Sequence, residues 1–172
     1  MSALFQTSRL RCRHWTSADF DAVYAIYSDP IAMRWVGEGK PITREACEKW
    51  FEVTEANYQT RGYGMLALED QATGLVIGCC GLIHPGGHPE VEIKYAFLRE
   101  HWGKGLASEL VPELLQYGYQ QHGLNRVIAT VDPENLVSQK ILVKAGANVV
   151  QHRVKEDGTT TLVFEWVTPS AA

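Results

Sequence analysis

The sequence predicts an α/β fold in which a mixed, mostly antiparallel sheet is flanked by helices. Segments that alternate polar and apolar residues, typical of strands, are interspersed with segments whose apolar residues recur every three to four positions, typical of helices. The chain has 172 residues, the usual length of one domain. No internal repeat or linker divides it, so we expect one domain over residues 1–172 with a core of about residues 7–168.

The elements of the first half follow from apolar spacing and from capping residues. Thr16 before an acidic turn opens the first helix, and Asp29-Pro30 ends it. The polar turn 70–74 joins two apolar strands into a hairpin. The predicted elements are a strand over 9–15, helices over 16–29 and 43–60 with a short helical piece over 30–35 between them, and strands over 63–69 and 75–83. The helix over 43–60 is expected to bury Ala46, Trp50, Val53 and Tyr58.

The second half begins with a strictly alternating strand over 90–98. Its apolar face carries Val91, Ile93, Tyr95 and Phe97, and its polar face carries Glu90, Glu92, Lys94 and Ala96. A long helix is expected from residue 102 or 103 to 122, although Pro112 within it would cost about 3 kcal/mol without a kink. The remaining elements are a strand over 125–131, a helix over 134–144, and strands over 148–155 and 160–168. The order is therefore β-α-α-β-β-β-α-β-α-β-β, with a β-α-β crossover in the middle.

Composition and charge exclude several functional classes. The longest mostly apolar run, 75–83, is too short to cross a bilayer, for which about 20 residues are needed. A net charge of −4 without long basic runs argues against nucleic acid as a partner. The first residues show no secretory signal, so we expect a cytoplasmic protein. The four cysteines lack metal or redox spacing and are expected to be reduced, and His84 with His88 forms only a turn, so no metal is expected.

The strongest local feature is the segment 98–107, where Gly103 and Gly105 flank Lys104 between a strand and a helix. Glycines allow a ligand to approach the backbone closely, and a helix N-terminus offers unpaired N–H groups to an anion. The segment is neither the dinucleotide-binding fingerprint nor a Walker loop. From the residues alone, an anion site and an ordinary strand-to-helix turn both remain open.

Four ordered motifs resemble one family, the GNAT N-acetyltransferases, and within it the branch of ribosomal-protein N-terminal acetyltransferases. The motifs are Thr7-Ser-Arg-Leu-Arg11, Ser28-Asp-Pro with Met33-Arg-Trp-Val, Glu92-Ile-Lys-Tyr-Ala-Phe-Leu98 followed by Trp102-Gly-Lys-Gly-Leu-Ala107, and Asn135-Leu-Val-Ser138 with Lys144-Ala-Gly146. They span about residues 7–168 in the element order of that fold. Two positions depart from the common pattern: Glu100 stands where Gln or Arg is usual, and Ala147 where Phe is common.

The resemblance implies an acetyl-CoA site. Backbone N–H groups from Trp102 to Ala107 would hold the pyrophosphate, with Arg99 and Lys104 adding charge, and the pantetheine arm would pair with the strand ending at Phe97. The N–H of Leu98 would face the thioester carbonyl, and Asn135 would bind the arm or cap its helix. The expected cofactor-binding residues are Phe97, Leu98, Arg99, Trp102, Gly103, Lys104, Gly105, Leu106, Ala107 and Asn135.

Two residues are candidates for the chemistry. Glu92 is the candidate base, directly or through a water, although it could instead form a surface ion pair with Lys94. The resemblance makes Ser138 the candidate acid for the departing thiolate, with Tyr117 and Tyr119 as weaker alternatives. An α-amine costs only about 1–1.4 kcal/mol to deprotonate at pH 7, against about 4.6 kcal/mol for a lysine, so N-terminal substrates scarcely need a strong base.

The expected function is transfer of an acetyl group from acetyl-CoA to a primary amine by direct attack in a ternary complex. A protein N-terminus is the first acceptor considered, and a small-molecule amine or antibiotic is the alternative. A non-catalytic acyl-CoA sensor and an unrelated phosphate-binding protein also remain open, as do a monomer and a homodimer. Glu90, Glu92 and Glu38 would suit a cationic acceptor. The aromatic residues Trp35, Trp50, Tyr58 and Tyr63 would line the acceptor cleft or the core.

Overall fold

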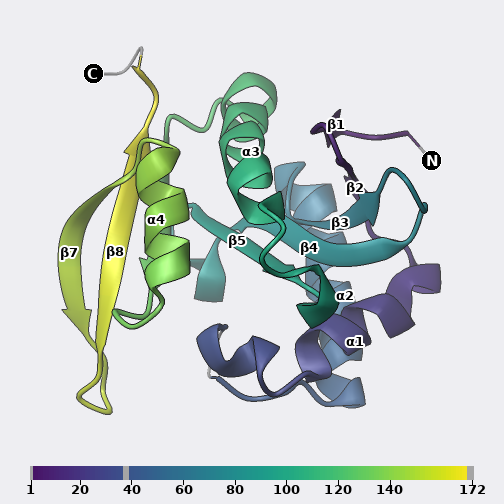
Figure 1. The fold of residues 1–172 in the computed structure, drawn as a ribbon, viewed down its shortest axis with the longest axis horizontal. Coiled ribbons are helices and arrows are strands. Elements are labelled where there is room, and N and C mark those ends of the chain that lie inside the picture. Colours follow the sequence, from purple (N-terminus) through teal and green to yellow (C-terminus); the bar gives the residue numbers. More distant parts are fainter. Residues whose placement is uncertain (1, 37–38, 170–172) are drawn as a thin grey trace.

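Eight strands form one mixed sheet in the part of the chain that the structure describes, in the order β1-β2-β3-β4-β5-β6-β8-β7. The computed structural model describes residues 2–36 and 39–169. Figure 1 shows the sheet running from β7 and β8 on one side of the molecule to β1 and β2 on the other. The strands are β1 (Phe5–Gln6), β2 (Leu10–His14), β3 (Met65–Asp70), β4 (Val76–Ile83), β5 (Glu92–Phe97), β6 (Arg126–Val131), β7 (Asn148–Val154) and β8 (Thr160–Val167).

Helices cover both faces of the sheet and create two apolar layers. The helices are α1 (Phe20–Ser28), α2 (Arg44–Arg61), α3 (Leu106–His122) and α4 (Leu136–Lys144), and short 3-10 turns cover Ser17–Asp19, Ala32–Trp35, Pro85–Gly87 and Arg99–His101. Leu110 and Leu114 of α3 pack with Leu142 of α4 against one face. Val23 and Ile26 of α1 pack with Cys47 of α2 against the other. None of the helices within the described residues is long and apolar enough to span a bilayer.

The sheet opens between β5 and β6. These strands are parallel and are joined through α3, in agreement with the predicted crossover. Only one pair of residues, Glu92 and Ile128, is in register between them. A further bond runs from the Ile128 amide to the Val91 carbonyl, 2.8 Å away. By contrast, β5 pairs with β4 continuously, from Ile83 opposite Glu92 to Gly78 opposite Phe97. The edge of β5 that faces β6 therefore has no strand partner over most of its length.

The predicted fold class is confirmed, with three local corrections. A short strand, Phe5–Gln6, precedes the first predicted one and pairs with it antiparallel. Helix α3 begins at Leu106, after the loop, because Gly103 and Gly105 both have positive φ angles. Helix α2 buries Cys47 and Thr54, whereas Ala46 is exposed and Val53 is half exposed, so the predicted buried face was rotated.

Pro112 lies within a continuous α3 and points to solvent. Its missing N–H would otherwise bond to the carbonyl of Ser108, four residues earlier, which is partly exposed. That carbonyl can therefore be hydrated. The exposed position explains why the helix tolerates the proline.

Candidate active site

The loop between β5 and α3 presents a row of backbone donors. Gly103 and Gly105 have φ angles of +72° and +77°, a region that side chains disfavour, and Gly105 is the N-cap of α3. The first helical bond runs from the Glu109 amide to the Gly105 carbonyl at 3.2 Å. The amides of Leu106, Ala107 and Ser108 therefore precede the first acceptor of the helix. They point along the helix axis to the place where an anion would bind.

A side-chain network holds this loop from the first strands of the sheet. The Arg9 guanidinium donates to the Lys104 carbonyl at 2.8 Å and to Glu109 Oε2 at 2.8 Å. The Arg9 amide and the Thr7 hydroxyl both donate to Glu109 Oε1. The opening motif, which the sequence offers only as a family resemblance, thus supplies contacts to the loop that were not predicted. One feature of the sequence could have indicated this contact: Glu109, an acidic residue in the first turn of α3, is suited to a basic partner.

The positive side chains of the loop differ in how they are engaged. Arg99 Nε donates to Asp29 Oδ2 at 2.9 Å, so its charge is matched by the Ser28-Asp-Pro motif. Lys104 lies with Arg9 and His101 along a cavity of about 430 Å³ beside the loop. Of the two predicted charge donors, Lys104 is therefore the one without a carboxylate partner in the described structure.

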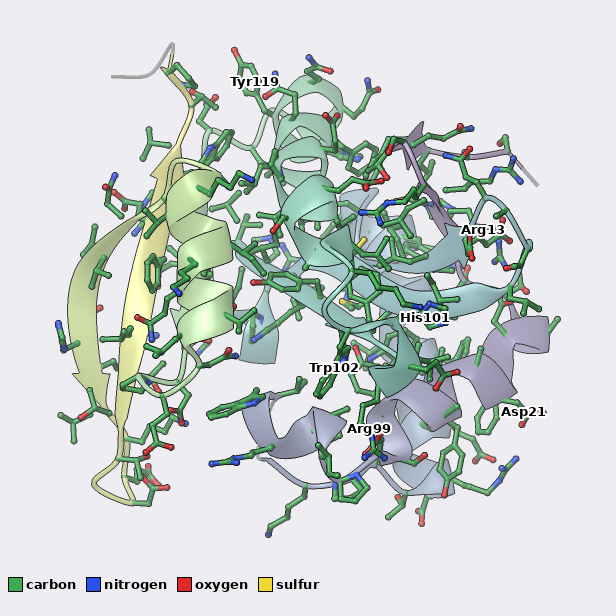
Figure 2. All side chains as sticks on the ribbon, viewed as in Figure 1. Arg13, Asp21, Arg99, His101, Trp102 and Tyr119 are labelled. Atoms are coloured by element: carbon green, nitrogen blue, oxygen red, sulfur yellow. The ribbon has the colours of Figure 1, made fainter. Side chains whose placement is uncertain are left out.

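Trp102 closes the loop onto β5. Its indole Nε1 donates to the Phe97 carbonyl at 2.9 Å, and the side chain is 43% exposed. Figure 2 shows Trp102 at the N-terminal end of α3, near His101 and Arg99. Trp102 thus lies beside the end of β5, at the edge of the opening between β5 and β6.

The expected role of the Leu98 amide is wrong. The Leu98 N–H donates to the Ile77 carbonyl on the β4 side at 2.9 Å, so it is not available to a thioester. Amide directions alternate along an antiparallel strand. The amides of Tyr95 and Phe97 therefore face the open edge of β5, and they are the donors that a ligand in the opening would meet.

Glu92 lies at the point where β5 and β6 separate. Its side chain is buried, with the whole residue 7% exposed. The Lys94 ammonium donates to Glu92 Oε1 at 2.7 Å, and the Thr130 hydroxyl of β6 donates to the same oxygen. Within residues 2–36 and 39–169, no donor is found for Oε2. The ion pair with Lys94 therefore leaves one oxygen of the same carboxylate without a donor among the described residues.

The acidic face that was expected to suit a cation is largely neutralised. Glu90 pairs with Arg126 at 3.0 Å and with Arg153 at 3.7 Å, and Glu92 pairs with Lys94. The third predicted carboxylate, Glu38, lies outside the described residues. The described part of this face therefore presents no excess of negative charge.

Ser138 lies in the first turn of α4, on the opposite face of the sheet from Glu92. Asn135 caps this helix by accepting the Ser138 amide at 3.2 Å. The Tyr95 hydroxyl lies 2.6 Å from Ser138 Oγ and so links β5 to α4 across the opening. Burial raises the pKa of Tyr95, and the hydrogen bond with Ser138 opposes that effect only partly. The sequence analysis placed Tyr95 on the apolar face and missed this contact.

The alternative acids, Tyr117 and Tyr119, lie at the wrong end of α3. Tyr119 is 13 positions beyond Leu106, a separation of about 20 Å along a helix. Figure 2 shows Tyr119 at the opposite end of α3 from Trp102. The ring of Tyr117 contacts Phe5 and His122, which are also far from the loop.

Three of the four aromatic residues considered for an acceptor cleft are engaged elsewhere. Trp50 packs on Trp15 in the second apolar layer. Tyr58 donates to the Met65 carbonyl, and Tyr63 bonds to His84 at 2.7 Å. Trp35, which lies beneath the Arg34 guanidinium at 4.7 Å, is the one that remains a candidate.

No group of three or more His, Cys, Asp or Glu side chains that could hold a metal occurs in the described residues. The groups that the structure brings together are backbone amides and hydroxyls, which can donate, and one carboxylate, which accepts. These groups fit a phosphate-bearing thioester, because the amides bind the anion while the carboxylate and the hydroxyls flank the opening.

Comparison with known proteins agrees with this geometry. Residues 9–148 match the family model described as an acetyltransferase (GNAT) domain. The uncharacterized N-acetyltransferase p20 of Bacillus licheniformis is 35% identical over 146 residues, 79% of this chain and 77% of that protein. The uncharacterized N-acetyltransferase YoaA of Bacillus subtilis (strain 168) is 29% identical over 175 residues, 98% of this chain and 99% of that protein.

Solved structures show the same fold. An acetyltransferase from Agrobacterium tumefaciens str. C58 has a TM-score of 0.82 at 25% identity, covering 98% of this chain and 95% of that one. A spermidine N-acetyltransferase from Vibrio cholerae, in complex with CoA and spermine, has a TM-score of 0.79 at 20% identity, covering 93% and 96%. RimL, a ribosomal L7/L12 α-N-protein acetyltransferase in complex with CoA, has a TM-score of 0.81 at 14% identity, covering 96% and 98%. At these last two identities the likeness concerns the fold alone, so the branch of the family stays a prediction.

Proposed function

The chain belongs to the GNAT family and is an acetyl-CoA-dependent N-acetyltransferase, and we propose that its acceptor is an N-terminal amine of a protein or peptide. RimL acts on such an amine, whereas the Vibrio cholerae enzyme is named for spermidine. The observation that carries the proposal is the Lys94 ammonium at 2.7 Å from Glu92 Oε1.

This ion pair leaves the candidate acceptor site close to neutral. A polyamine carries several positive charges and would meet the Lys94 ammonium beside the only buried carboxylate of the described β5. A peptide N-terminus brings a single amine, which costs only about 1–1.4 kcal/mol to deprotonate at pH 7. One free carboxylate oxygen, or a water bound to it, is sufficient for that task.

The opening between β5 and β6 would bring the two reactants together. Glu92 lies on the face of the sheet that packs against α1 and α2, and Ser138 lies on the face of α4. The acetyl donor would bind along the open edge of β5 with its pyrophosphate on the amides of Leu106 to Ser108. The Phe97 amide would then be the oxyanion donor in place of Leu98.

The proposed reaction is a direct transfer. The amine loses a proton to Glu92 Oε2 or its water and attacks the thioester carbonyl. The carbon–sulfur bond breaks, and the Ser138 hydroxyl donates a hydrogen bond to the departing thiolate. Asn135 holds the helix turn that presents Ser138, and its amide nitrogen is free to bind the pantetheine arm.

An acceptor panel tests the proposal. CoA release is measured with four acceptors. Two are peptides: a pentapeptide that has a free N-terminal serine, and the same peptide with a blocked N-terminus and a lysine. The other two are spermidine and an aminoglycoside. We expect release with the free N-terminus alone, and preference for spermidine would contradict the proposal. In the matched variant Lys94→Gln, the activity with spermidine should rise relative to the peptide. Calorimetric binding of acetyl-CoA without release for any amine would indicate a sensor instead.

A further inference from the structure

The hydroxyl of Ser138 has a neighbour that the family resemblance does not explain. Tyr95 projects from β5 toward α4, and its phenolic oxygen lies 2.6 Å from Ser138 Oγ. The two halves of the sheet share one register pair, and this bond connects β5 to α4 across the opening. It lies on the face where the thiol of a bound donor would reach α4.

The direction of this hydrogen bond decides what Ser138 can do. A hydroxyl has one proton and two lone pairs. If Tyr95 donates, the Ser138 oxygen is satisfied and its own proton remains free for a third group. A phenol, with an ordinary pKa of about 10, is a stronger acid than an alkyl alcohol, which favours Tyr95 as the donor.

We propose that Tyr95 is a positioning residue that aims the Ser138 proton at the departing sulfur. The inference deepens the proposed function and rests on it for the role of Ser138. Tyr95 donates to Ser138 Oγ, and Ser138 donates to the thiolate as the carbon–sulfur bond breaks. Both residues keep their protons, and the sulfur takes its proton from water after the bond has broken.

The surroundings of Tyr95 agree with a fixed donor. Burial raises its pKa, so the phenol remains protonated throughout the working range of the enzyme. Its ring packs at the border of the apolar layer beneath α3 and α4. The Ser138 backbone is held independently by Asn135, so loss of the phenolic hydroxyl should leave the helix turn in place.

The variants Tyr95→Phe, Ser138→Ala and the double variant test the inference. We expect Tyr95→Phe to lower kcat about five- to tenfold, with the KM for acetyl-CoA within twofold of the wild type. The double variant should be no slower than Ser138→Ala, because both residues act through one hydroxyl. The loss should lie in kcat alone and should vanish in the Ser138→Ala background, which the loss of a merely structural contact would not produce.

Tyr63→Phe is the matched control, because it removes a comparably short phenolic hydrogen bond, 2.7 Å to His84, that does not involve Ser138. Its kcat should stay unchanged. Additive losses in the double variant, or an unchanged kcat in Tyr95→Phe, would overturn the positioning role.

Assays with two acceptors distinguish a failure of this inference from a failure of the proposed function. All variants are assayed with the serine pentapeptide and with spermidine. If the wild type acetylates only spermidine, the proposed acceptor is wrong, and the Tyr95 comparison is then decided on spermidine. If the wild type releases CoA with neither amine, the proposed acceptor and the proposed role of Tyr95 are both overturned.

Discussion

At the residue scale, Glu92 combines two roles that sequence reasoning set against each other. Lys94 and Thr130 both donate to Oε1, which fixes the carboxylate in one orientation. Oε2 has no donor among the described residues. The ion pair is therefore compatible with the role of a base that we propose for Glu92, because each oxygen of a carboxylate accepts hydrogen bonds separately.

Glu92→Gln should lower kcat most strongly at low pH. More of the acceptor amine is protonated there, so the loss of the proton acceptor matters more. We expect a loss of about a hundredfold at pH 6.5 that shrinks toward tenfold or less at pH 9. The pH profile of kcat measures it, and Glu90→Gln, which alters an exposed ion pair two positions away, is the control. A loss of equal size at every pH would assign the proton transfer to another group.

The sequence offers Glu92 and Ser138 as candidates for the chemistry, but it does not predict the residues that hold them. Strand alternation correctly separates Glu92 from Tyr95, yet it says nothing about a partner on another element. Tyr95 meets Ser138 only because α4 packs across the opening, 43 residues later in the chain. The Leu98 amide was assigned wrongly because its bonding depends on the register with β4, which alternation alone does not determine.

At the scale of elements, the β5–α3 loop is shaped by two glycines and held by the turn between β1 and β2. Arg9 in that turn donates to the Lys104 carbonyl and to Glu109, so the loop is fixed from outside the helix that it begins. The two glycines are visible in the sequence, and their role in cofactor binding stays a prediction. The Arg9 contact spans 95 residues and could be found only from the fold.

Gly103→Ala should raise the KM for acetyl-CoA about tenfold with little change in kcat at saturation. An added Cβ would meet no protein atom within 4 Å, so its cost is the strained φ angle and the obstructed approach of the pyrophosphate. Gly123→Ala is a close control, because Gly123 has a φ of +65° and equally open space at the other end of α3. Both variants should lose about 1 kcal/mol of stability. An unchanged KM in Gly103→Ala would remove the loop from the cofactor site.

At the scale of the whole molecule, a buried ion network joins β2, the 3-10 turn Ser17–Asp19 and β3. Arg13 of β2 bonds Asp19 at 2.8 Å and Glu69 of β3 at 2.6 Å. Burial works to raise the pKa of Asp19, but hydrogen bonds from Arg13 and Thr16 outweigh it and hold that pKa below its usual value. The folded state therefore favours the charged carboxylate.

Asp19→Asn should lower the free energy of unfolding by about 2 kcal/mol at pH 7, less than for a fully buried pair because Glu69 still neutralises Arg13. Because the pKa of Asp19 is depressed on folding, its contribution is present above the unfolded pKa of about 3.9 and is lost as the pH falls through the folded value. The unfolding free energies of wild type and variant, measured in urea, should thus begin to converge as the pH falls below about 4. Asp21→Asn, at an exposed position, should show neither effect. A difference that does not shrink as the pH is lowered further would assign the stabilisation to packing.

The opening between β5 and β6 affects how fast backbone amide hydrogens exchange with solvent. Two sub-sheets, β1–β5 and β6–β8, share one register couple, so the amides of Tyr95 and Phe97 have no strand to protect them. An acetyl donor lying along that edge would act as a removable strand. Hydrogen exchange at these two amides is then governed by the dissociation of the donor and not by the stability of the fold.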